Sequence, residues 1–313
     1  MDALRGIAAL LVVIFHLEFI FGMKTGFGRG YLAVDLFFSL SGYVMARSYE
    51  YKLAQGLGAA GFLKARLLRL WPIMAVGAVL GVPALYGDYP LPLLLSWCAM
   101  ALVFVPVFSG RLPVFPINSP AWSILFELFA NLAHAVILRR LPVAGLLAIA
   151  AICGAVLLAF ARSMDIGVDP ATFWLAIPRV LFSYCLGIAL WRLARDRRLF
   201  AFEWSVALLI GGLVLAGLVP REQGWPDFVI TMIVSPVILC GGLAAPHYAK
   251  GVLNYLGEIS FPLYAVHFPV ITLGWMAGLP PLLCPVAALV AASVLRPLGK
   301  LKAIAPKALP QPA

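Results

Sequence analysis

Long apolar runs dominate this sequence and leave one broad class of fold open to it. A helix that spans the hydrocarbon core of a bilayer needs about 20 mostly apolar residues. Eleven runs come close to this requirement, near residues 3–22, 31–47, 67–86, 91–109, 119–138, 143–161, 172–192, 203–219, 228–244, 255–278 and 280–297. With 63% hydrophobic residues, 12% charged residues and a mean hydropathy of +1.01, a water-soluble surface is excluded. The sequence therefore predicts an all-α, polytopic membrane helix bundle.

Basic residues lie between the apolar runs and indicate which segments face the cytoplasm. Five groups follow five of the runs. They are Arg47, Lys52, Lys64, Arg66 and Arg69 after the second run, Arg139 and Arg140 after the fifth, Arg192, Arg195, Arg197 and Arg198 after the seventh, Lys250 after the ninth, and Arg296, Lys300, Lys302 and Lys307 after the last. Basic loops are usually cytoplasmic, but strict alternation of all eleven runs cannot place every cluster on one side. The proline-rich run 91–109 is the weakest, so we expect it to be re-entrant or broken. About ten transmembrane helices then remain, with both termini in the cytoplasm.

The remaining composition defines one domain and excludes several functions. We expect a membrane domain over residues 1–300 and a short, disordered cytoplasmic tail over 301–313. His16 and Glu18 interrupt the first run, so it is interpreted as an uncleaved span and not as a signal peptide. The net charge is +10, but the basic residues lie in the loops that determine topology, so the charge does not indicate a nucleic-acid partner. The five cysteines are far apart, with no metal-ligand spacing, so no metal site is expected.

Titratable residues inside the first two runs are the first candidates for chemistry. Arg5 and His16 are eleven positions apart, which places them on one helix face about 16 Å apart along the axis. Asp35 precedes Arg47 by twelve residues, which places it near the depth of His16 in an antiparallel neighbour. A carboxylate beside an imidazole raises its basicity and prepares a general base. A structural ion pair between two helices is the alternative.

Two further runs carry regularly spaced polar residues. Asp35, Ser39 and Gly42 share one face of the second run, a pattern that suits close packing or ligand contact. Ser119, Ser123, Glu127 and Asn131 recur every four residues and form a polar stripe, which must face a wet cavity or bonding partners. Glu127 could be a second acid or base, an acceptor for a substrate hydroxyl, or a partner for Arg5.

The last candidates lie near the third and tenth runs. Arg66 and Arg69 lie three apart on one face, where paired guanidinium groups suit phosphate, although an ordinary basic anchor is the alternative. Ser260, Tyr264 and His267 share another face and predict a polar lining. No role is assigned to His134 and His247.

The motifs taken together resemble those of acyltransferase family 3. The residues that match its motifs are Arg5 and His16 of Arg-x10-His, Phe37, Phe38, Ser41 and Gly42 of FFxxSG, Arg66 and Arg69 of RxxR, Ser119, Trp122, Ser123 and Glu127 of SxxWSLxxE, and Ser260, Tyr264 and His267 of LGxxSYxxYxxH. They occur in family order over about residues 2–270. Phe261 replaces a usual tyrosine, and the closing VLRPLGK lacks the glutamate often found before its proline.

The resemblance implies a stand-alone O-acyltransferase of the bacterial inner membrane. Its donor would be cytoplasmic acyl-coenzyme A, with acetyl-CoA favoured, used as a co-substrate and not as a tightly bound cofactor. Its acceptor would be a hydroxyl of a carbohydrate, a lipid-linked sugar or another exported molecule, in contact with membrane lipids. The implied catalytic residues are His16, Asp35 and Glu127. The implied donor-binding residues are Arg5, Arg66, Arg69, Ser41 and Gly42, and the implied substrate pocket contains Trp122, Ser123, Tyr264 and His267. A membrane transporter of a small anionic or acylated solute is the alternative.

Overall fold

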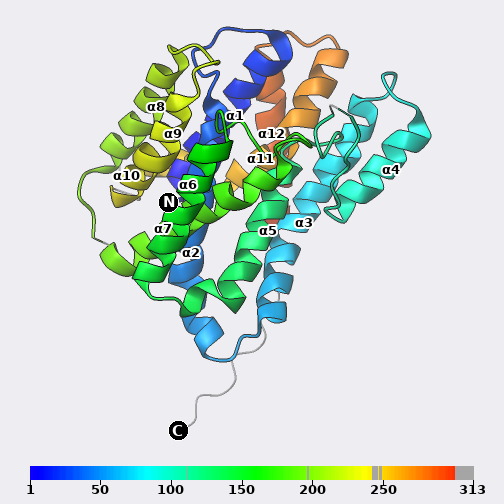
Figure 1. Ribbon diagram of the computed structural model, residues 1–313. Coiled ribbons are helices and arrows are strands. Elements are labelled where there is room, and N and C mark those ends of the chain that lie inside the picture. Colours follow the sequence, from blue (N-terminus) through cyan, green and yellow to red (C-terminus); the bar gives the residue numbers. More distant parts are fainter. Residues whose placement is uncertain (111, 196, 242–245, 247–248, 300–313) are drawn as a thin grey trace.

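The protein is a bundle of helices, which confirms the predicted all-α class (Figure 1). The computed structural model describes residues 1–110, 112–195, 197–241, 246 and 249–299. Within them the helices are α1 (Asp2–Phe21), α2 (Ala33–Ala54), α3 (Ala59–Ala84), α4 (Leu91–Leu102), α5 (Ala121–Val136), α6 (Val143–Phe160), α7 (Ala176–Ala194), α8 (Phe202–Gly217), α9 (Trp225–Val229), α10 (Ser235–Cys240), α11 (Lys250–Met276) and α12 (Cys284–Gly299). The predicted tail 301–313 and His247 lie outside these residues.

The helices follow the apolar runs of the sequence. In the described part of the chain, five helical segments are long and apolar enough to cross a membrane: α1, α3, α6, residues 173–194 around α7, and α11. Helices α9 and α10 join through a π-helical turn, Ile230–Val234, into one segment over 225–240. Helix α4 has twelve residues and is about 18 Å long, well short of the roughly 30 Å hydrocarbon core. Its length agrees with the predicted non-spanning run.

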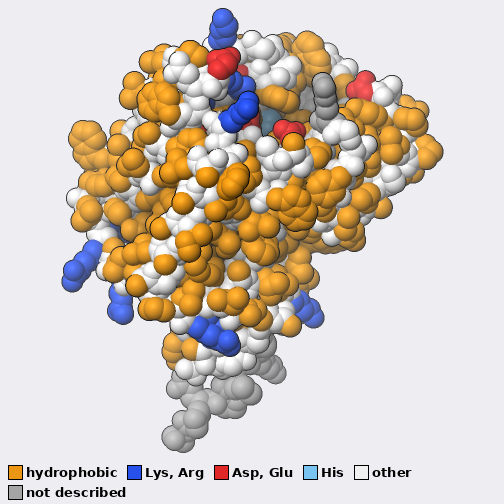
Figure 2. Space-filling model, viewed as in Figure 1, with side chains coloured by type: hydrophobic (Ala, Val, Ile, Leu, Met, Phe, Trp, Pro, Cys, Tyr) orange, Lys and Arg blue, Asp and Glu red, His pale blue; other side chains and the backbone are white. Residues whose placement is uncertain are grey.

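The surface of the bundle divides into apolar sides and two polar ends. Hydrophobic side chains cover most of the side seen in Figure 2, and charged side chains gather at its two ends. At one end α2 passes into α3 through the basic segment 47–69, and we call this the basic end. At the other end lie the connections 22–32, 161–175 and 218–224, and we call this the far end. This distribution is that of a protein whose sides face lipid.

Helices α2 and α7 pack closely enough that their contact requires glycine. A Cβ atom added at Gly42 would lie 2.1 Å from the carbonyl oxygen of Tyr184, and one added at Gly187 would lie 2.0 Å from that of Ser39. Small residues allow backbones to approach in this way in membrane helices. The contact fixes the depth of α2 against α7.

Helices α1 and α11 pack in a fixed register. A Cβ atom added at Gly6 would lie 2.7 Å from the backbone carbon of Leu256, and one added at Gly257 would lie 2.5 Å from Cβ of Asp2. Both helices run from the basic end toward the far end. His16 follows Gly6 by ten residues and His267 follows Leu256 by eleven, so the Gly6–Leu256 contact brings the two imidazoles to the same depth.

Candidate active site

A cavity of about 460 Å³ lies between α1, α2, α3, α5 and α11. Its lining begins at the basic end with Asp2 and Asn254, near the starts of α1 and α11. It ends toward the middle of the bundle at Val34, Phe37 and Tyr264. Polar residues line the part at the basic end, and Phe37 and Tyr264 lie at its inner end. The cavity therefore leads from the basic end toward the depth of the histidines.

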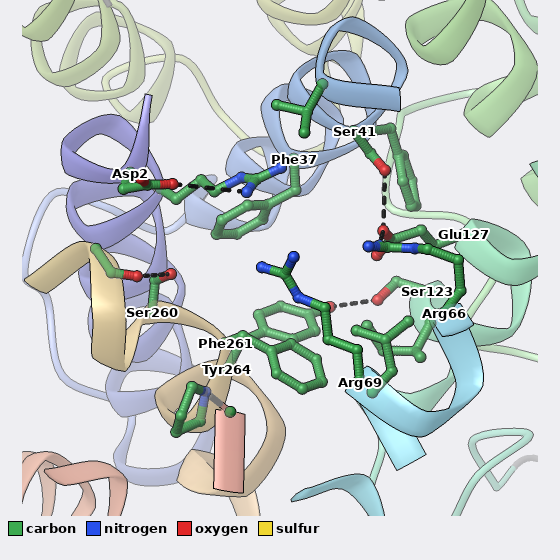
Figure 3. A pocket seen from close by; sticks show the side chains of 18 of the residues that line it. Asp2, Phe37, Ser41, Arg66, Arg69, Ser123, Glu127, Ser260, Phe261 and Tyr264 are labelled. Atoms are coloured by element: carbon green, nitrogen blue, oxygen red, sulfur yellow. Dashed lines mark hydrogen bonds and ion pairs between the residues drawn. The ribbon is translucent and has the colours of Figure 1, made fainter. Parts of the chain in front are cut away.

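Three arginines line this cavity, and the structure brings together residues that the sequence predicted separately. The Arg69 side chain projects into the middle of the cavity and is solvent-exposed (Figure 3). Arg5 lies across from it, and its Nη1 is 3.8 Å from a carboxylate oxygen of Asp2. Arg66 is buried in the wall. Three guanidinium groups around one cavity suit a polyanion such as a phosphorylated coenzyme.

Glu127 joins the wall arginine to the polar face of α2. Its Oε1 accepts hydrogen bonds from Nη2 of Arg66 at 2.8 Å and from Oγ of Ser41 at 2.9 Å (Figure 3). The possibility that Glu127 pairs with Arg5 is therefore wrong, because Arg66 occupies its carboxylate and Arg5 pairs with Asp2. Buried charges need such partners because an unpaired one costs several kcal/mol.

The inner end of the cavity is closed by a tyrosine. The Tyr264 hydroxyl lies 2.6 Å from Oγ of Ser123, which itself donates to the carbonyl oxygen of Pro120. Because Ser123 uses its proton there, Tyr264 is the donor in the first bond. The Tyr264 ring packs against Phe37 at 5.6 Å between ring centroids. The ring of His267 lies 5.9 Å beyond it.

His16 and His267 form a pair just past this tyrosine. Nε2 of His267 lies 3.2 Å from Nδ1 of His16, and the two ring centroids are 4.7 Å apart. His267 is fully buried, whereas His16 is partly exposed. Neither lines the cavity that opens at the basic end. The pair therefore lies beyond the inner end of that cavity.

Backbone carbonyls fix which nitrogen of each ring carries the proton. Nδ1 of His16 faces the carbonyl oxygen of Val12 at 2.9 Å, and Nδ1 of His267 faces that of Tyr264 at 2.8 Å. A carbonyl oxygen only accepts, so both Nδ1 atoms are protonated in the neutral rings. Nε2 of His267 then accepts from Nδ1–H of His16. Nε2 of His16 keeps its lone pair, and no described residue hydrogen-bonds to it. That nitrogen is the open base of the pair.

Asp35 does not lie against His16, so the predicted pairing of these two residues is wrong. The Asp35 carboxylate is fully buried and accepts from Nε of Arg179 at 3.0 Å and from Nη2 at 2.8 Å. Oγ1 of Thr231 donates to the same carboxylate at 3.3 Å. The close α2–α7 contact explains the pairing, because Asp35 and Arg179 each lie in the first turn of one of these helices. His267 takes the neighbouring position expected of Asp35.

Two other expected site residues lie in the packing around the cavity and do not line it. Gly42 was expected to bind the donor, but it faces the backbone of α7 at Tyr184. Trp122 was expected in the substrate pocket, but its ring packs under the guanidinium of Arg179, 5.3 Å from the ring centroid. Ser41, Ser123 and Tyr264 do line the cavity.

The sequence reasoning missed the buried arginines of the far end. Arg179 and Arg29 are each about 1% exposed, and each binds a buried aspartate. Arg179 offered a signal, because a lone arginine near the start of an apolar run requires an anionic partner. Arg29 lies just before a run, where it resembles an ordinary interfacial cation. Its partner, Asp227, is 198 positions away in sequence.

Comparison with known proteins gives the chain its family. Residues 1–296 match the acyltransferase 3 family model, described as an acyltransferase domain. "Protein 2 in picA locus" of Rhizobium radiobacter is 37% identical over 153 residues, which are 43% of this chain and 79% of that protein. "Putative membrane-bound transacylase BcsY" of Komagataeibacter xylinus is 28% identical over 289 residues, 86% of this chain and 71% of that protein. No solved structure matches significantly. The chain belongs to the acyltransferase 3 family and is a membrane acyltransferase.

Proposed function

We propose that the protein moves an acyl group from acyl-coenzyme A at the basic end to an acceptor hydroxyl that reaches His16 from the far end. The observation that carries this proposal is the position of the histidine pair. A cavity with three arginines reaches Tyr264 from the basic end, the His267 ring lies 5.9 Å from the Tyr264 ring between centroids, and no described residue hydrogen-bonds to Nε2 of His16. Such an arrangement suits a reaction whose two substrates come from opposite sides.

The donor proposal rests on the charge of the cavity. Arg5 and Arg69 offer accessible guanidinium donors, and Arg66 adds positive charge to the wall. The basic end also carries the loops that the positive-inside rule places in the cytoplasm, where acyl-coenzyme A is made. Its phosphates would meet the arginines, and its thioester would extend toward Tyr264. Acetyl-CoA is the donor we favour.

The chemical step needs a general base for the acceptor hydroxyl and a proton for the leaving thiolate. The acceptor oxygen forms a bond to the thioester carbonyl carbon while Nε2 of His16 takes the hydroxyl proton. The carbon–sulfur bond then breaks, and the leaving thiolate recovers that proton from His16, so the products are an O-acyl ester and free coenzyme A. General base catalysis of this kind is worth about 10² to 10⁴ in rate. His267 holds Nδ1–H of His16, which keeps Nε2 aimed away from it.

The acceptor proposal rests on the membership of the acyltransferase 3 family and on the position of the far end. If the basic end is cytoplasmic, an acceptor of the cell envelope that carries a hydroxyl group, such as a carbohydrate or a lipid-linked sugar, would approach from outside. The inner membrane is then the expected location, with the N-terminus inside. We propose that the C-terminus faces the cytoplasm as well.

A thioester-consumption assay tests the proposal. Purified protein in nanodiscs is supplied with radiolabelled acetyl-CoA and with the envelope fraction of a host that lacks the gene. We expect label to move into the envelope fraction and free coenzyme A to appear in equal amount. Uptake of label across proteoliposomes without release of coenzyme A would support a transporter instead.

A further inference from the structure

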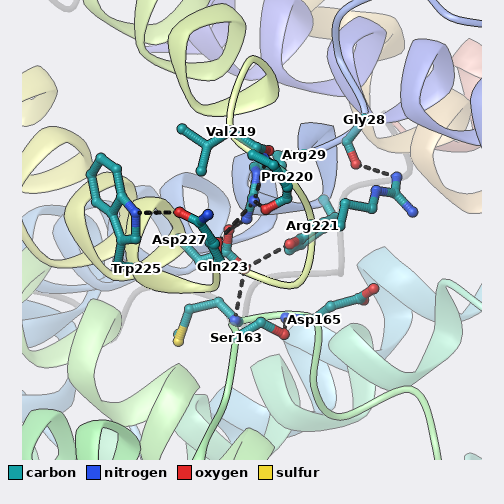
Figure 4. Close-up of polar contacts among 12 residues, drawn as sticks. Gly28, Arg29, Ser163, Asp165, Val219, Pro220, Arg221, Gln223, Trp225 and Asp227 are labelled. Carbon is teal, nitrogen blue, oxygen red and sulfur yellow. Dashed lines mark hydrogen bonds and ion pairs between the residues drawn. The ribbon is translucent and has the colours of Figure 1, made fainter.

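Two charged side chains lie open at the far end, on neighbouring loops. Arg221 belongs to the connection between α8 and α9, and Asp165 to the connection between α6 and α7. Both side chains are exposed. Figure 4 shows their charged groups on the same side of the two loops, and Figure 2 shows charged side chains around a hollow at this end of the molecule.

Arg221 is held in place by a carbonyl oxygen and an aromatic ring, and the Glu18 carboxylate lies near it at Gly28 without a direct ion pair. Its Nη2 donates to the carbonyl oxygen of Gly28, and its guanidinium carbon lies 5.8 Å from the ring centroid of Phe15 (Figure 4). The Phe15 ring is in turn 4.8 Å from that of His16. Within the described residues, Arg221 makes no ion pair with a carboxylate. Its remaining donors are therefore available next to the proposed base.

Asp165 is presented outward by its two neighbours in the chain. Met164 and Ile166 are buried, and both use their backbone in hydrogen bonds: Met164 N donates to Asp227, and the Ile166 carbonyl oxygen accepts from Arg179. The Asp165 carboxylate itself accepts no hydrogen bond from a described residue. Although solvent reaches the carboxylate, desolvation by the surrounding residues raises its pKa, and the positive charges of Arg179 and Arg221 oppose that rise. The Asp165 carboxylate lies on the same side of the two loops as the Arg221 guanidinium (Figure 4).

One buried ion pair fixes both loops. The Arg29–Asp227 pair is almost completely buried. Nη2 of Arg29 donates to the carbonyl oxygens of three residues of the loop that carries Arg221, namely Val219, Pro220 and Gln223 (Figure 4). Oδ2 of Asp227 accepts from Met164 N in the loop that carries Asp165 at 2.9 Å. The same pair thus holds the two open side chains in a fixed relation, which is preorganisation of the kind that a binding site needs.

We propose that Arg221 and Asp165 form the acceptor subsite of the proposed reaction and hold a saccharide by its hydroxyl groups. A carboxylate accepts from sugar hydroxyls and a guanidinium donates to them, so the two together suit a neutral polyhydroxyl ligand. A lipid phosphate would be attracted by Arg221 but repelled by Asp165. The subsite rests on the proposed function, because it positions the hydroxyl that His16 would deprotonate.

The test compares conservative variants of the two residues with variants of exposed charged neighbours on the same two loops. Arg221→Gln and Asp165→Asn are set against Glu222→Gln and Arg162→Gln, which change exposed charges on the same two loops. Each full-length protein is assayed in nanodiscs for label transfer from acetyl-CoA to the envelope fraction, for acetyl-CoA binding and for thermal unfolding. We expect transfer to fall about tenfold in each subsite variant because a hydrogen bond to a charged group is lost. Acetyl-CoA binding and unfolding temperature should not change, and both control variants should behave as the parent.

A blocking experiment gives an independent readout. The described cysteines are buried or half-buried, so a membrane-impermeant thiol reagent should react with Asp165→Cys or with Arg162→Cys in preference. We expect a bulky label at position 165 to abolish transfer and the same label at 162 to leave it unchanged. Parental transfer by both subsite variants, or equal loss in the controls, would overturn the subsite. A parent that binds acetyl-CoA but acylates nothing in the envelope fraction would overturn the proposed function and the subsite with it.

Discussion

Nδ1 of His16 lies 3.2 Å from Nε2 of His267, although 251 positions separate the two residues in sequence. The glycine contacts between α1 and α11 set this distance, because they fix the register of the two helices. The carbonyl oxygen of Tyr264 fixes the proton on the far nitrogen of His267. The pair therefore has one open basic nitrogen, and it belongs to His16. A histidine takes here the orienting position that a carboxylate occupies in many catalytic triads.

The first prediction concerns this pair. His16→Ala should reduce acyl transfer by about 10² to 10⁴ because the base is lost. His267→Leu should also lower transfer, since the imidazolium that forms on His16 then loses the Nε2 acceptor of His267 and keeps only the carbonyl oxygen of Val12 as a partner for Nδ1–H. His267→Gln should retain more activity than His267→Leu, because its amide oxygen can still accept from Nδ1–H of His16. The measurement is transfer normalised to folded protein.

The double variant and a matched histidine provide the control for this prediction. Residues that act as a unit lose activity non-additively, so His16→Ala with His267→Leu should be hardly worse than His16→Ala alone. His134 is another fully buried histidine, and it lies outside the cavity lining. His134→Gln should keep normalised transfer near the parent. Near-parental transfer in His16→Ala would contradict the assigned role.

A second prediction concerns Asp35 and Arg179, which we interpret as a structural pair. Asp35→Asn or Arg179→Gln should each destabilise the fold by about 3–5 kcal/mol, the usual cost of leaving one buried charge without its partner. The double variant should lose less than the sum, because neither charge then remains unpaired. Thermal unfolding in detergent measures this. A strong loss of normalised transfer in Asp35→Asn, with unchanged stability, would restore a catalytic role to Asp35.

The sequence was sufficient for the fold class and for several of the residues that gather around the cavity. Apolar runs are long-range signals of helices in lipid, so every predicted run corresponds to a helical segment. Spacing along one helix also placed Ser260 and Tyr264 on one face, and both line the cavity. Partners on different helices were less predictable. The pairing of Asp35 with His16 was predicted only from their similar depth in the membrane. Depth does not specify the direction in which a side chain points around its helix.

The third prediction concerns orientation in the membrane. Lys52 is exposed at the basic end and Glu222 at the far end. If the basic loops are cytoplasmic, an impermeant thiol reagent added to intact cells should label Glu222→Cys and leave Lys52→Cys unlabelled until the membrane is permeabilised. The parent chain with its native cysteines is the background control. Labelling of position 52 from outside in intact cells would reverse the orientation and remove the argument that the donor enters from the basic end.

The last prediction separates Arg69 from Arg66 within the donor cavity. Arg69 is exposed in the cavity, and within the described residues it makes no ion pair, so Arg69→Ala should weaken coenzyme A binding about 10- to 100-fold without loss of stability. Arg69→Lys should recover part of the affinity, because a lysine keeps the charge but not the planar fork. Arg66→Ala should weaken binding and also destabilise the fold, since it leaves Glu127 without its cation.

Lys64→Ala is the matched control for the cavity arginines. Lys64 is exposed on the same helix but does not line the cavity, so its removal should leave coenzyme A affinity at the parental value. Binding is measured by calorimetry on protein in nanodiscs, with thermal unfolding in parallel. Equal affinity in Arg69→Ala and the parent would mean that the arginines serve only as a topology anchor.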